Sequence, residues 1–410
     1  MKFKTDVREE KQVASQQRIK EGNLTLIFNL IKSKDIISRS ELAQITKLSP
    51  TTISSLVDEL LRNNMVVEIG AGTTTTSGRK PIMLEVNPYG GYVAAVEMLK
   101  DSFRCYLYDL NCKPVGGGKY EVKDYVSFGG QVISKVDELL ESHSIGKKSL
   151  LGIGIGIPGL IDYEKNRVLS STVLAIEPDN DFYDQIKAYY CGIPVFLQNE
   201  SCFYAYAEKE YGQLKDVRNL VFIDINVGIG AGIVLNGQIF SGSFGTAGEI
   251  GHMTIDMKGP KCVCGNRGCL EVMASVPAIL QKVVFAVMAG RNTIVNDLVK
   301  NDYNGVNLEV ISEALKKGDT LISEIVDETA DALAYGINNI INLFSPEVIA
   351  IGGELTKLGD GLLDRVKARL CNIGLLNNIN KVRIKYSVLG EDAVTLGGAK
   401  YSLDRLFEIK

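Results

Sequence analysis

The sequence predicts an α/β protein in which a small N-terminal helical domain precedes a larger, two-lobed body. Apolar residues recur at helical spacing up to Leu61, and from Tyr92 strand-like segments alternate with helical ones. Asn87-Pro88 is the expected junction. The expected domains are residues 1–88, a first α/β lobe over residues 89–198 and a second lobe over residues 199–410, whose last helix packs back on the first lobe.

Composition limits the classes of protein to consider. The 410 residues are 45% hydrophobic and 23% charged, without a low-complexity tract, as expected of a globular protein. No run approaches the roughly 18 apolar residues of a membrane span, and the polar start has no apolar signal-peptide core. We therefore expect a cytoplasmic protein without membrane contact. Residues 1–88 carry 13 Lys and Arg against 10 Asp and Glu, a small excess that permits nucleic-acid binding without demonstrating it.

Three short helices are expected in the N-terminal domain. The first covers about Asn23 to Ser33. Ser38-Arg39-Ser40-Glu41 is a capping box that starts the second helix, and Ser49 with Pro50 provides an N-cap and first-turn proline for the third. Two helices joined by a tight turn match a helix-turn-helix. Strands at Val66–Ile69 and Ile82–Val86 around a Gly/Thr-rich segment complete a candidate winged helix-turn-helix.

The expected DNA contacts lie on the third helix and the wing. The small hydroxyl side chains of the helix can enter a major groove, and the two basic wing residues can reach a phosphate or the minor groove. The candidates are Ser49, Thr51, Thr52, Ser54, Ser55, Arg79 and Lys80. A plain interaction domain with a flexible Gly/Thr-rich loop is the alternative for this region.

The segment from Gly248 to Glu271 indicates a metal site. It contains four donors within eighteen residues, namely His252, Cys262, Cys264 and Cys269. One imidazole and three thiolates form the donor set of a closed tetrahedral zinc site, and the intervening glycines permit a tight loop. We expect structural zinc, because the protein fills all four positions and leaves none for an activated water. Buried cysteines beside an incidental histidine are the alternative.

The body continues with further expected strands and helices. Strands are expected at Tyr92–Leu99, Ser102–Asp109, Leu150–Ile157, Val195–Leu197 and Val348–Gly352, and helices at Ser127–His143, Asn307–Lys317, Leu321–Phe344 and Val394–Leu406. Gln198-Asn199-Glu200-Ser201 lies at a strand-to-helix corner, where a helix N-terminus adds hydrogen-bond donors for a ligand. A helix cap alone is the other interpretation of Asn199 and Glu200.

Gly-Glu-Ile-Gly-His at residues 248–252, followed by Cys-x-Cys-Gly-x-x-Gly-Cys-x-Glu, resembles the signature of the ROK family of bacterial sugar kinases and sugar-responsive repressors. The resemblance covers about residues 22–405 and implies an actin-like, ribonuclease-H-like pair of lobes with the sugar in the cleft. The sugar contacts that it implies are Asn199, Glu200, Glu249, His252 and Glu271.

Two departures from the family's kinases argue against catalysis. Glu200 stands where those kinases have the Asp that deprotonates the sugar, and a shift of about 1 Å in a catalytic group can cost on the order of 100-fold in rate. Glu97-Met98-Leu99-Lys100-Asp101 replaces their Asp-x-Gly-Gly-Thr turn, where glycines let the backbone approach the ATP phosphates. The glycines near Gly228 and Gly352 are equally explained by strand packing. We expect no catalytic residue and no bound ATP.

The leading hypothesis is therefore a sugar-responsive repressor that binds a palindromic operator as a homodimer. The Asn-Glu pair and the Ser-Gly-Arg-Lys-Pro segment are most similar to those of the family's xylose repressors. Xylose is therefore the favoured effector, with glucose or another aldose as alternatives. The competing hypotheses are an active sugar kinase with a fused DNA-binding domain, and a constitutive DNA-binding protein whose body only dimerises.

Overall fold

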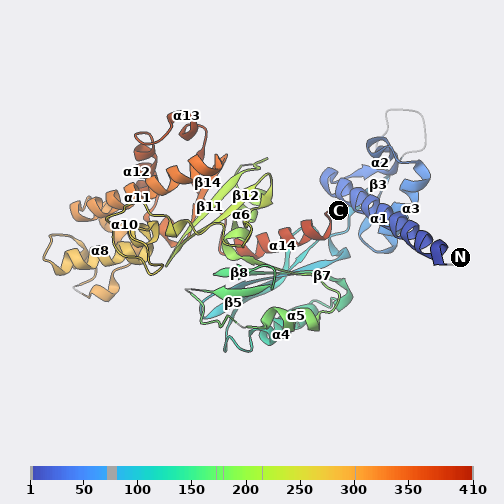
Figure 1. Cartoon of the computed structure of the whole chain (residues 1–410), viewed down its shortest axis with the longest axis horizontal. Coiled ribbons are helices and arrows are strands. Elements are labelled where there is room, and N and C mark those ends of the chain that lie inside the picture. Colours follow the sequence, from blue (N-terminus) through green and yellow to red (C-terminus); the bar gives the residue numbers. More distant parts are fainter. Residues whose placement is uncertain are drawn as a thin grey trace.

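The computed structural model describes residues 3–71, 81–171, 173–178, 180–214, 216–300 and 302–408. Figure 1 shows an N-terminal group of helices beside a two-lobed α/β body, with helix α14 lying between them. None of the helices in these residues is long and apolar enough to cross a membrane.

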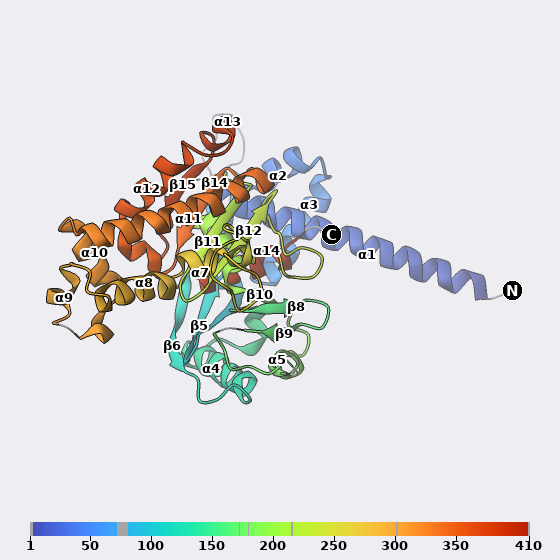
Figure 2. The ribbon, with the colours of Figure 1, turned by 60° about the vertical axis from the view of Figure 1, so that its left-hand side comes forward.

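The N-terminal domain combines helices with a small antiparallel sheet. Its elements are α1 (Phe3–Lys34), β1 (Ile37–Ser38), α2 (Arg39–Thr46), α3 (Pro50–Arg62), β2 (Val66–Ala71) and β3 (Ile82–Val86), and the strand order is β1-β3-β2. The expected start of the first helix near Asn23 was wrong, because α1 already begins at Phe3. The added turns hold polar helix formers such as Glu, Lys, Gln and Arg, which give no apolar stripe to detect. This part of α1 extends away from the rest of the chain (Figure 2).

The expected caps of α2 and α3 are confirmed. Ser38 accepts a hydrogen bond from the backbone N–H of Glu41, and a carboxylate oxygen of Glu41 accepts one from the backbone N–H of Ser38 at 2.8 Å. Ser49 caps α3 by accepting a 3.1 Å hydrogen bond from the N–H of Thr52. Each cap satisfies donors that the first helical turn leaves free. The chain therefore encodes both starts locally.

The first lobe is a mixed five-stranded sheet with helices α4 (Phe128–Ser142) and α5 (Phe182–Tyr189) on one face. Its strands are β4 (Tyr92–Met98), β5 (Ser102–Asp109), β6 (Pro114–Glu121), β7 (Leu150–Ile157) and β10 (Val195–Asn199), in the order β10-β7-β4-β5-β6. The two helices pack on it through a core that includes Phe103, Phe128 and Phe182. The hairpin of β8 (Leu160–Asp162) and β9 (Arg167–Ser170) follows β7. Our sequence-based assignment did not include β6, β8, β9 or α5.

The second lobe repeats this sheet. Strands β11 (Leu220–Ile225), β12 (Ile229–Leu235), β13 (Gln238–Ile239), β14 (Val348–Gly352) and β15 (Arg383–Tyr386) run in the order β13-β12-β11-β14-β15. The helical elements of this lobe are α6 (Glu200–Tyr211), η3 (Ile250–His252), α7 (Leu270–Ala274), α8 (Val276–Met288), α9 (Val295–Leu298), η4 (Tyr303–Gly305), α10 (Leu308–Lys316), α11 (Thr320–Phe344), η5 (Glu354–Leu358), α12 (Asp360–Leu370) and α13 (Leu376–Ile379).

Both sheets have the same topology. In each, the first two strands are antiparallel, and the fourth and fifth run parallel to the first. Two such lobes in tandem form an actin-like, ribonuclease-H-like body, which confirms the expected fold. The sequence shows no matching repeat, since the duplication lies in strand order.

The last helix, α14 (Ala393–Leu406), joins the parts of the molecule. It packs against β4 and β7 of the first lobe and against α6. Leu403 and Ala399 of α14 belong to the same hydrophobic cluster as Phe28 and Leu42 of the N-terminal domain. A single apolar core therefore continues from α14 into the N-terminal helices.

Candidate functional site

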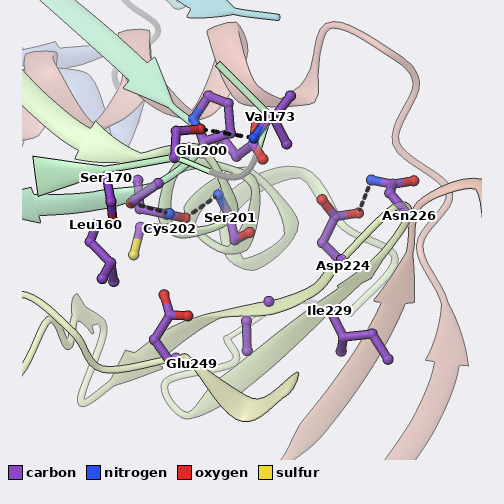
Figure 3. Close-up of a pocket in the computed structure, with 18 of the residues that line it drawn as sticks. Leu160, Ser170, Val173, Glu200, Ser201, Cys202, Asp224, Asn226, Ile229 and Glu249 are labelled. Carbon is purple, nitrogen blue, oxygen red and sulfur yellow. Dashed lines mark hydrogen bonds between the residues drawn. The ribbon is translucent and has the colours of Figure 1, made fainter. Parts of the chain in front are cut away.

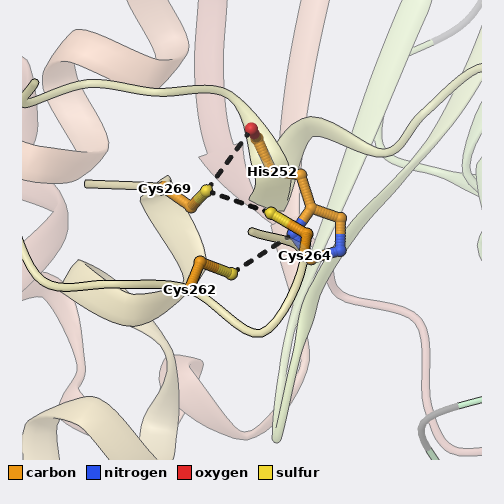
Figure 4. A group of neighbouring side chains, drawn as sticks. All are labelled: His252, Cys262, Cys264 and Cys269. Carbon is orange, nitrogen blue, oxygen red and sulfur yellow. Dashed lines mark hydrogen bonds between the residues drawn. The ribbon is translucent and has the colours of Figure 1, made fainter. Parts of the chain in front are cut away.

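The four proposed metal ligands converge on one point of the second lobe. Their ligand atoms all lie within 4.8 Å of one another. Figure 4 shows the four side chains grouped together. His252 lies in η3, Cys262 and Cys264 lie in the loop that follows, and Cys269 caps α7. All eight cysteines of the chain are free thiols.

The distances within this cluster fit a tetrahedral zinc site. Zn–S bonds of about 2.3 Å place two sulfur ligands about 3.8 Å apart. Sγ of Cys264 lies 3.6 Å from Sγ of Cys269, and Sγ of Cys262 lies 3.7 Å from Nδ1 of His252. Gly268 has φ +60°, and a Cβ there would lie 1.6 Å from the carbonyl oxygen of Asp256, so this turn requires glycine. The three cysteines and His252 can therefore hold zinc without rearrangement of the loop.

A cavity of about 350 Å³ lies beside this loop, between the two lobes. Residues from both lobes surround it, among them Leu160 of the first lobe and Glu200 and Glu249 of the second (Figure 3). All five residues proposed to contact sugar line it, namely Asn199, Glu200, Glu249, His252 and Glu271. The fold thus brings together residues up to 72 positions apart in the sequence.

Asn199 and Glu200 have different tasks at the corner between β10 and α6. The Asn199 side chain caps α6 by accepting from the N–H of Ser201 at 2.8 Å, and its Nδ2 donates to the carbonyl of Gly159 at 3.0 Å. Asn199 is therefore the N-cap of α6, and its side chain also holds the Pro158-Gly159 turn in place. Within the described part of the chain, no group donates a hydrogen bond to the Glu200 carboxylate, which lines the cavity. Glu200 can accept from a ligand hydroxyl.

The loop that carries the four candidate metal ligands presents the other polar groups. Nε2 of His252 lies 4.0 Å from the carboxylate of Glu249. Burial raises the pKa of Glu249, His252 opposes this, and Glu271 adds to it. Glu271 accepts a 3.1 Å hydrogen bond from the backbone N–H of Ile229, which holds it against the start of β12. Carboxylate acceptors and an imidazole around one cavity suit a ligand with several hydroxyl groups.

The floor of the cleft is unusually acidic. Burial raises the pKa of Glu97 to about 7 despite its 2.8 Å ion pair with Arg104, and burial raises the pKa of Asp224 to about 6. Burial also raises the pKa of Glu200 well above its usual range, and the neighbouring Asp224 and Glu97 carboxylates add to this. Three carboxylates that share a cleft therefore make it unfavourable for a further negative charge.

A second cavity adjoins the first and shares Leu99, Glu200 and Asp224 with it. It is lined by five carboxylate side chains and by only two basic ones; these are Glu97, Glu200, Asp224, Glu354 and Glu391, with Arg104 and Lys357. Met98 is fully buried, and the N–H of Leu99 is used by a 2.8 Å hydrogen bond to the carbonyl of Ser102. The N–H of Leu99 is therefore not free to bind a ligand, and the excess of carboxylates over basic side chains in the lining is unfavourable for a phosphate group.

Packing requires glycine at particular positions of the glycine-rich segments in the second lobe. A Cβ on Gly232 would lie 1.8 Å from the carbonyl oxygen of Ser201, and one on Gly352 would lie 2.4 Å from the ring of Phe222. Gly353 has φ +83° and lies against Asp224 and Ile225. These glycines permit close approach of neighbouring elements.

The sequence did not reveal several residues that line the 350 Å³ cavity, which is called the sugar-side cavity from here on because all five residues proposed to contact sugar line it. They come from the β8–β9 hairpin and from the loop after β13, and include Tyr163, Ser170, Ser171, Val173 and Ser241. The hydroxyl of Tyr163 donates a 2.8 Å hydrogen bond to Gln198, just before the Asn199-Glu200 corner. No motif accompanies these residues. The Pro158-Gly159 turn was the only signal that a wall of the cavity follows.

The proposed DNA contacts of α3 lie at its N-terminal end. Ser49, Thr51 and Ser55 are exposed, and Thr52 and Ser54 are half-buried. Ile53, Leu56, Val57 and Leu60 bury the opposite face. One open face of α3 therefore presents small hydroxyl side chains. The proposed wing contacts Arg79 and Lys80 lie outside the described residues.

The comparisons with known proteins agree with this arrangement. The model of the ROK family matches residues 94–405, and the chain belongs to that family. The xylose repressor of Bacillus subtilis is 29% identical over 406 residues, which cover 97% of this chain and 99% of the relative.

Two solved structures locate the shared parts. A ROK family transcriptional regulator, a homologue of the Escherichia coli Mlc protein, superposes with a TM-score of 0.82 at 27% identity and covers 96% of this chain and 98% of its own. A ROK family glucokinase from Streptomyces griseus, solved with glucose and AMPPNP, superposes with a TM-score of 0.63 at 22% identity. This match covers 76% of this chain and 99% of the glucokinase. The N-terminal domain is thus shared with the regulator, and the glucokinase likeness shows the fold of the body.

Proposed function

We propose that this protein is a sugar-responsive transcriptional repressor with a structural zinc ion and a body that does not catalyse phosphoryl transfer. The main support is that one chain combines two features. Helix α3 has an exposed face with hydroxyl side chains, and the cavity is lined by Asn199, Glu200, Glu249, His252 and Glu271. The near full-length similarity to a xylose repressor supports this function.

The effector that we propose is xylose, with glucose or another aldose as alternatives. Glu200 and Glu249 would accept hydrogen bonds from sugar hydroxyls, and His252 would face the sugar through Nε2 while Nδ1 holds zinc. The zinc ion would fix the loop that carries these groups. The sugar would close the cleft between the lobes, and it must bind the closed form more tightly than the open form to shift the equilibrium.

On the DNA side, we propose a homodimer that places two α3 helices in successive major grooves of a palindromic operator. Ser49, Thr51, Thr52, Ser54 and Ser55 would contact phosphates and base edges. Arg79 and Lys80 would contact the backbone or the minor groove from the wing. A change in lobe closure would alter the separation of the two helices and hence the affinity for the operator.

An active sugar kinase with a fused DNA-binding domain is the second candidate. One observation favours it. The Glu200 carboxylate lines the sugar-side cavity, and no group in the described residues donates a hydrogen bond to it. Against it stand the acidic lining of the second cavity and the buried Met98 side chain, which takes a position where the family's kinases have glycine. A coupled assay of ATP turnover with xylose and glucose distinguishes the two. We expect no turnover above the protein-free rate, and phosphorylation at rates typical of enzymes would overturn the proposal.

The main test is fluorescence anisotropy of the protein on DNA from its own upstream region, at fixed salt, with and without each sugar. We expect tight binding that xylose alters. The Glu249→Ala variant should keep operator binding and lose the response to sugar. Operator affinity that is unchanged by every sugar, in both the parent and this variant, would instead indicate a constitutive DNA-binding protein.

A further inference from the structure

Helix α6 starts at the sugar-side cavity. Glu200 is its first residue, so a ligand that displaces this carboxylate acts directly on the helix. Helix α14 packs on α6 at backbone distance, because a Cβ added to Gly397 would lie 1.9 Å from the carbonyl oxygen of Phe203. Contacts this close leave little room for the two helices to slide past one another.

Polar contacts tie the same two helices together further along. The hydroxyl of Tyr206 donates a 2.6 Å hydrogen bond to Asp404, and Lys400 pairs with Glu210 at 3.0 Å. Lys400 also pairs with Asp404 on its own helix. These contacts lie one to two turns beyond Gly397, so backbone packing, a hydrogen bond and an ion pair join α6 and α14 over most of their length.

The far end of α14 contacts the DNA-binding domain. Nδ2 of Asn29 in α1 donates a 2.8 Å hydrogen bond to the carbonyl of Phe407, and the rings of Phe28 and Phe407 lie 4.3 Å apart between centroids. Figure 1 shows α14 running from the body to the N-terminal helices. The path from the cavity to α1 therefore passes through two helices and one aromatic contact.

We propose that the α6–α14 pair transmits sugar binding to the DNA-binding domain through Phe407, with Asn29 and Phe28 as the receiving side chains. The inference rests on the proposed sugar-responsive function and adds the route of regulation. Sugar bound at Glu200 shifts α6, α14 moves with it, and the contact of Phe407 with α1 reorients the α3 helix of that protomer. A rigid element with two arrangements, each favoured by one ligand, is what such coupling requires.

The test compares Asn29→Ala and Phe407→Leu with the parent protein and with a matched control, Ser33→Ala. Ser33 also lies on α1, but its hydroxyl donates to the carbonyl of Leu30 in its own helix. Anisotropy gives operator affinity with and without xylose, and calorimetry gives xylose affinity. Coupling of this kind typically changes affinity 5- to 150-fold. We expect both variants to reduce the parent's sugar-induced change to less than about twofold and to keep xylose affinity and sugar-free operator affinity within about twofold.

The outcomes test two things separately: the proposed function, and the α6–α14–Phe407 route, which is called the relay here. A parent protein that binds neither operator nor any sugar would overturn both. A responsive parent with equally responsive Asn29→Ala and Phe407→Leu variants would overturn the relay alone. Loss of sugar-free operator binding in both variants would also overturn it, since the contact would then maintain the fold of the DNA-binding domain. Ser33→Ala should respond as the parent does.

Discussion

Nε2 of His252 lies 4.0 Å from the carboxylate of Glu249, while Nδ1 of the same ring lies 3.7 Å from Sγ of Cys262. The imidazole thus stands between the cysteine cluster and the sugar-side cavity. A metal ion on Nδ1 would leave the N–H on Nε2, where it faces Glu249 and the cavity. Zinc would therefore set both the orientation and the tautomer of the ring that we propose as a sugar contact.

The zinc site can be tested with Cys264→Ser, because Cys264 is exposed and its replacement leaves no buried gap. The variant should contain clearly less than one zinc ion per chain by elemental analysis. Loss of a ligand should also lower the thermal midpoint by roughly 5–10 °C, as expected for about 2–3 kcal/mol in a domain of this size. Cys191→Ser, an equally exposed position away from the cluster, serves as the control. Full zinc content in Cys264→Ser would refute the assignment.

Operator binding should depend on the basic wing residues in a salt-dependent way. Replacing both Arg79 and Lys80 by Ala removes two cationic side chains, each of which can release a condensed counterion from DNA. Affinity should fall, and the slope of log affinity against log salt should decrease by about one for each lost phosphate contact. Anisotropy titrations at several salt concentrations measure both. An unchanged slope would show that neither residue contacts a phosphate.

The sequence predicted the local features of the molecule better than the assembled ones. The caps at Ser38 and Ser49 depend on neighbours within three residues, so the pattern alone determines them. Glu97 and Asp224 are far apart in sequence, and only the packing of two sheets brings them to the same cleft as Glu200. The β8–β9 wall was missed for a similar reason, since Tyr163 acquires its role by bonding Gln198 across the fold.

The buried carboxylate Glu97 predicts a pH dependence of stability. It is 5% exposed, and burial raises its pKa from 4.5 to about 7 in the folded protein. The folded state therefore holds a proton that the unfolded state releases between these values, so the free energy of unfolding falls as pH rises from about 4.5 to 7. Its contribution to that fall is on the order of 3 kcal/mol.

Glu97→Gln removes this titration and keeps an oxygen that can accept from Arg104. Urea unfolding at pH 5 and pH 7.5 should show a smaller loss of stability in the variant than in the parent. Part of the loss should persist, because burial also raises the pKa values of Asp224 and Glu200. Glu121→Gln, at an exposed end of β6, should behave as the parent does. Equal losses in the parent and Glu97→Gln would contradict the assignment.

The tight packing of α14 on α6 predicts that replacing glycine by alanine has opposite effects on stability at two helical positions. An alanine methyl at Gly397 would lie 1.9 Å from the carbonyl oxygen of Phe203, whereas one at Gly130 in α4 would meet nothing within 4 Å. Glycine costs a helix about 1 kcal/mol relative to alanine, so Gly130→Ala should stabilise the protein by up to about that amount. Gly397→Ala gains the same propensity but forces two backbones apart, which should cost about 1–3 kcal/mol or more overall. Thermal unfolding of both variants measures the difference, and a stabilised Gly397→Ala would mean that α14 can move relative to α6.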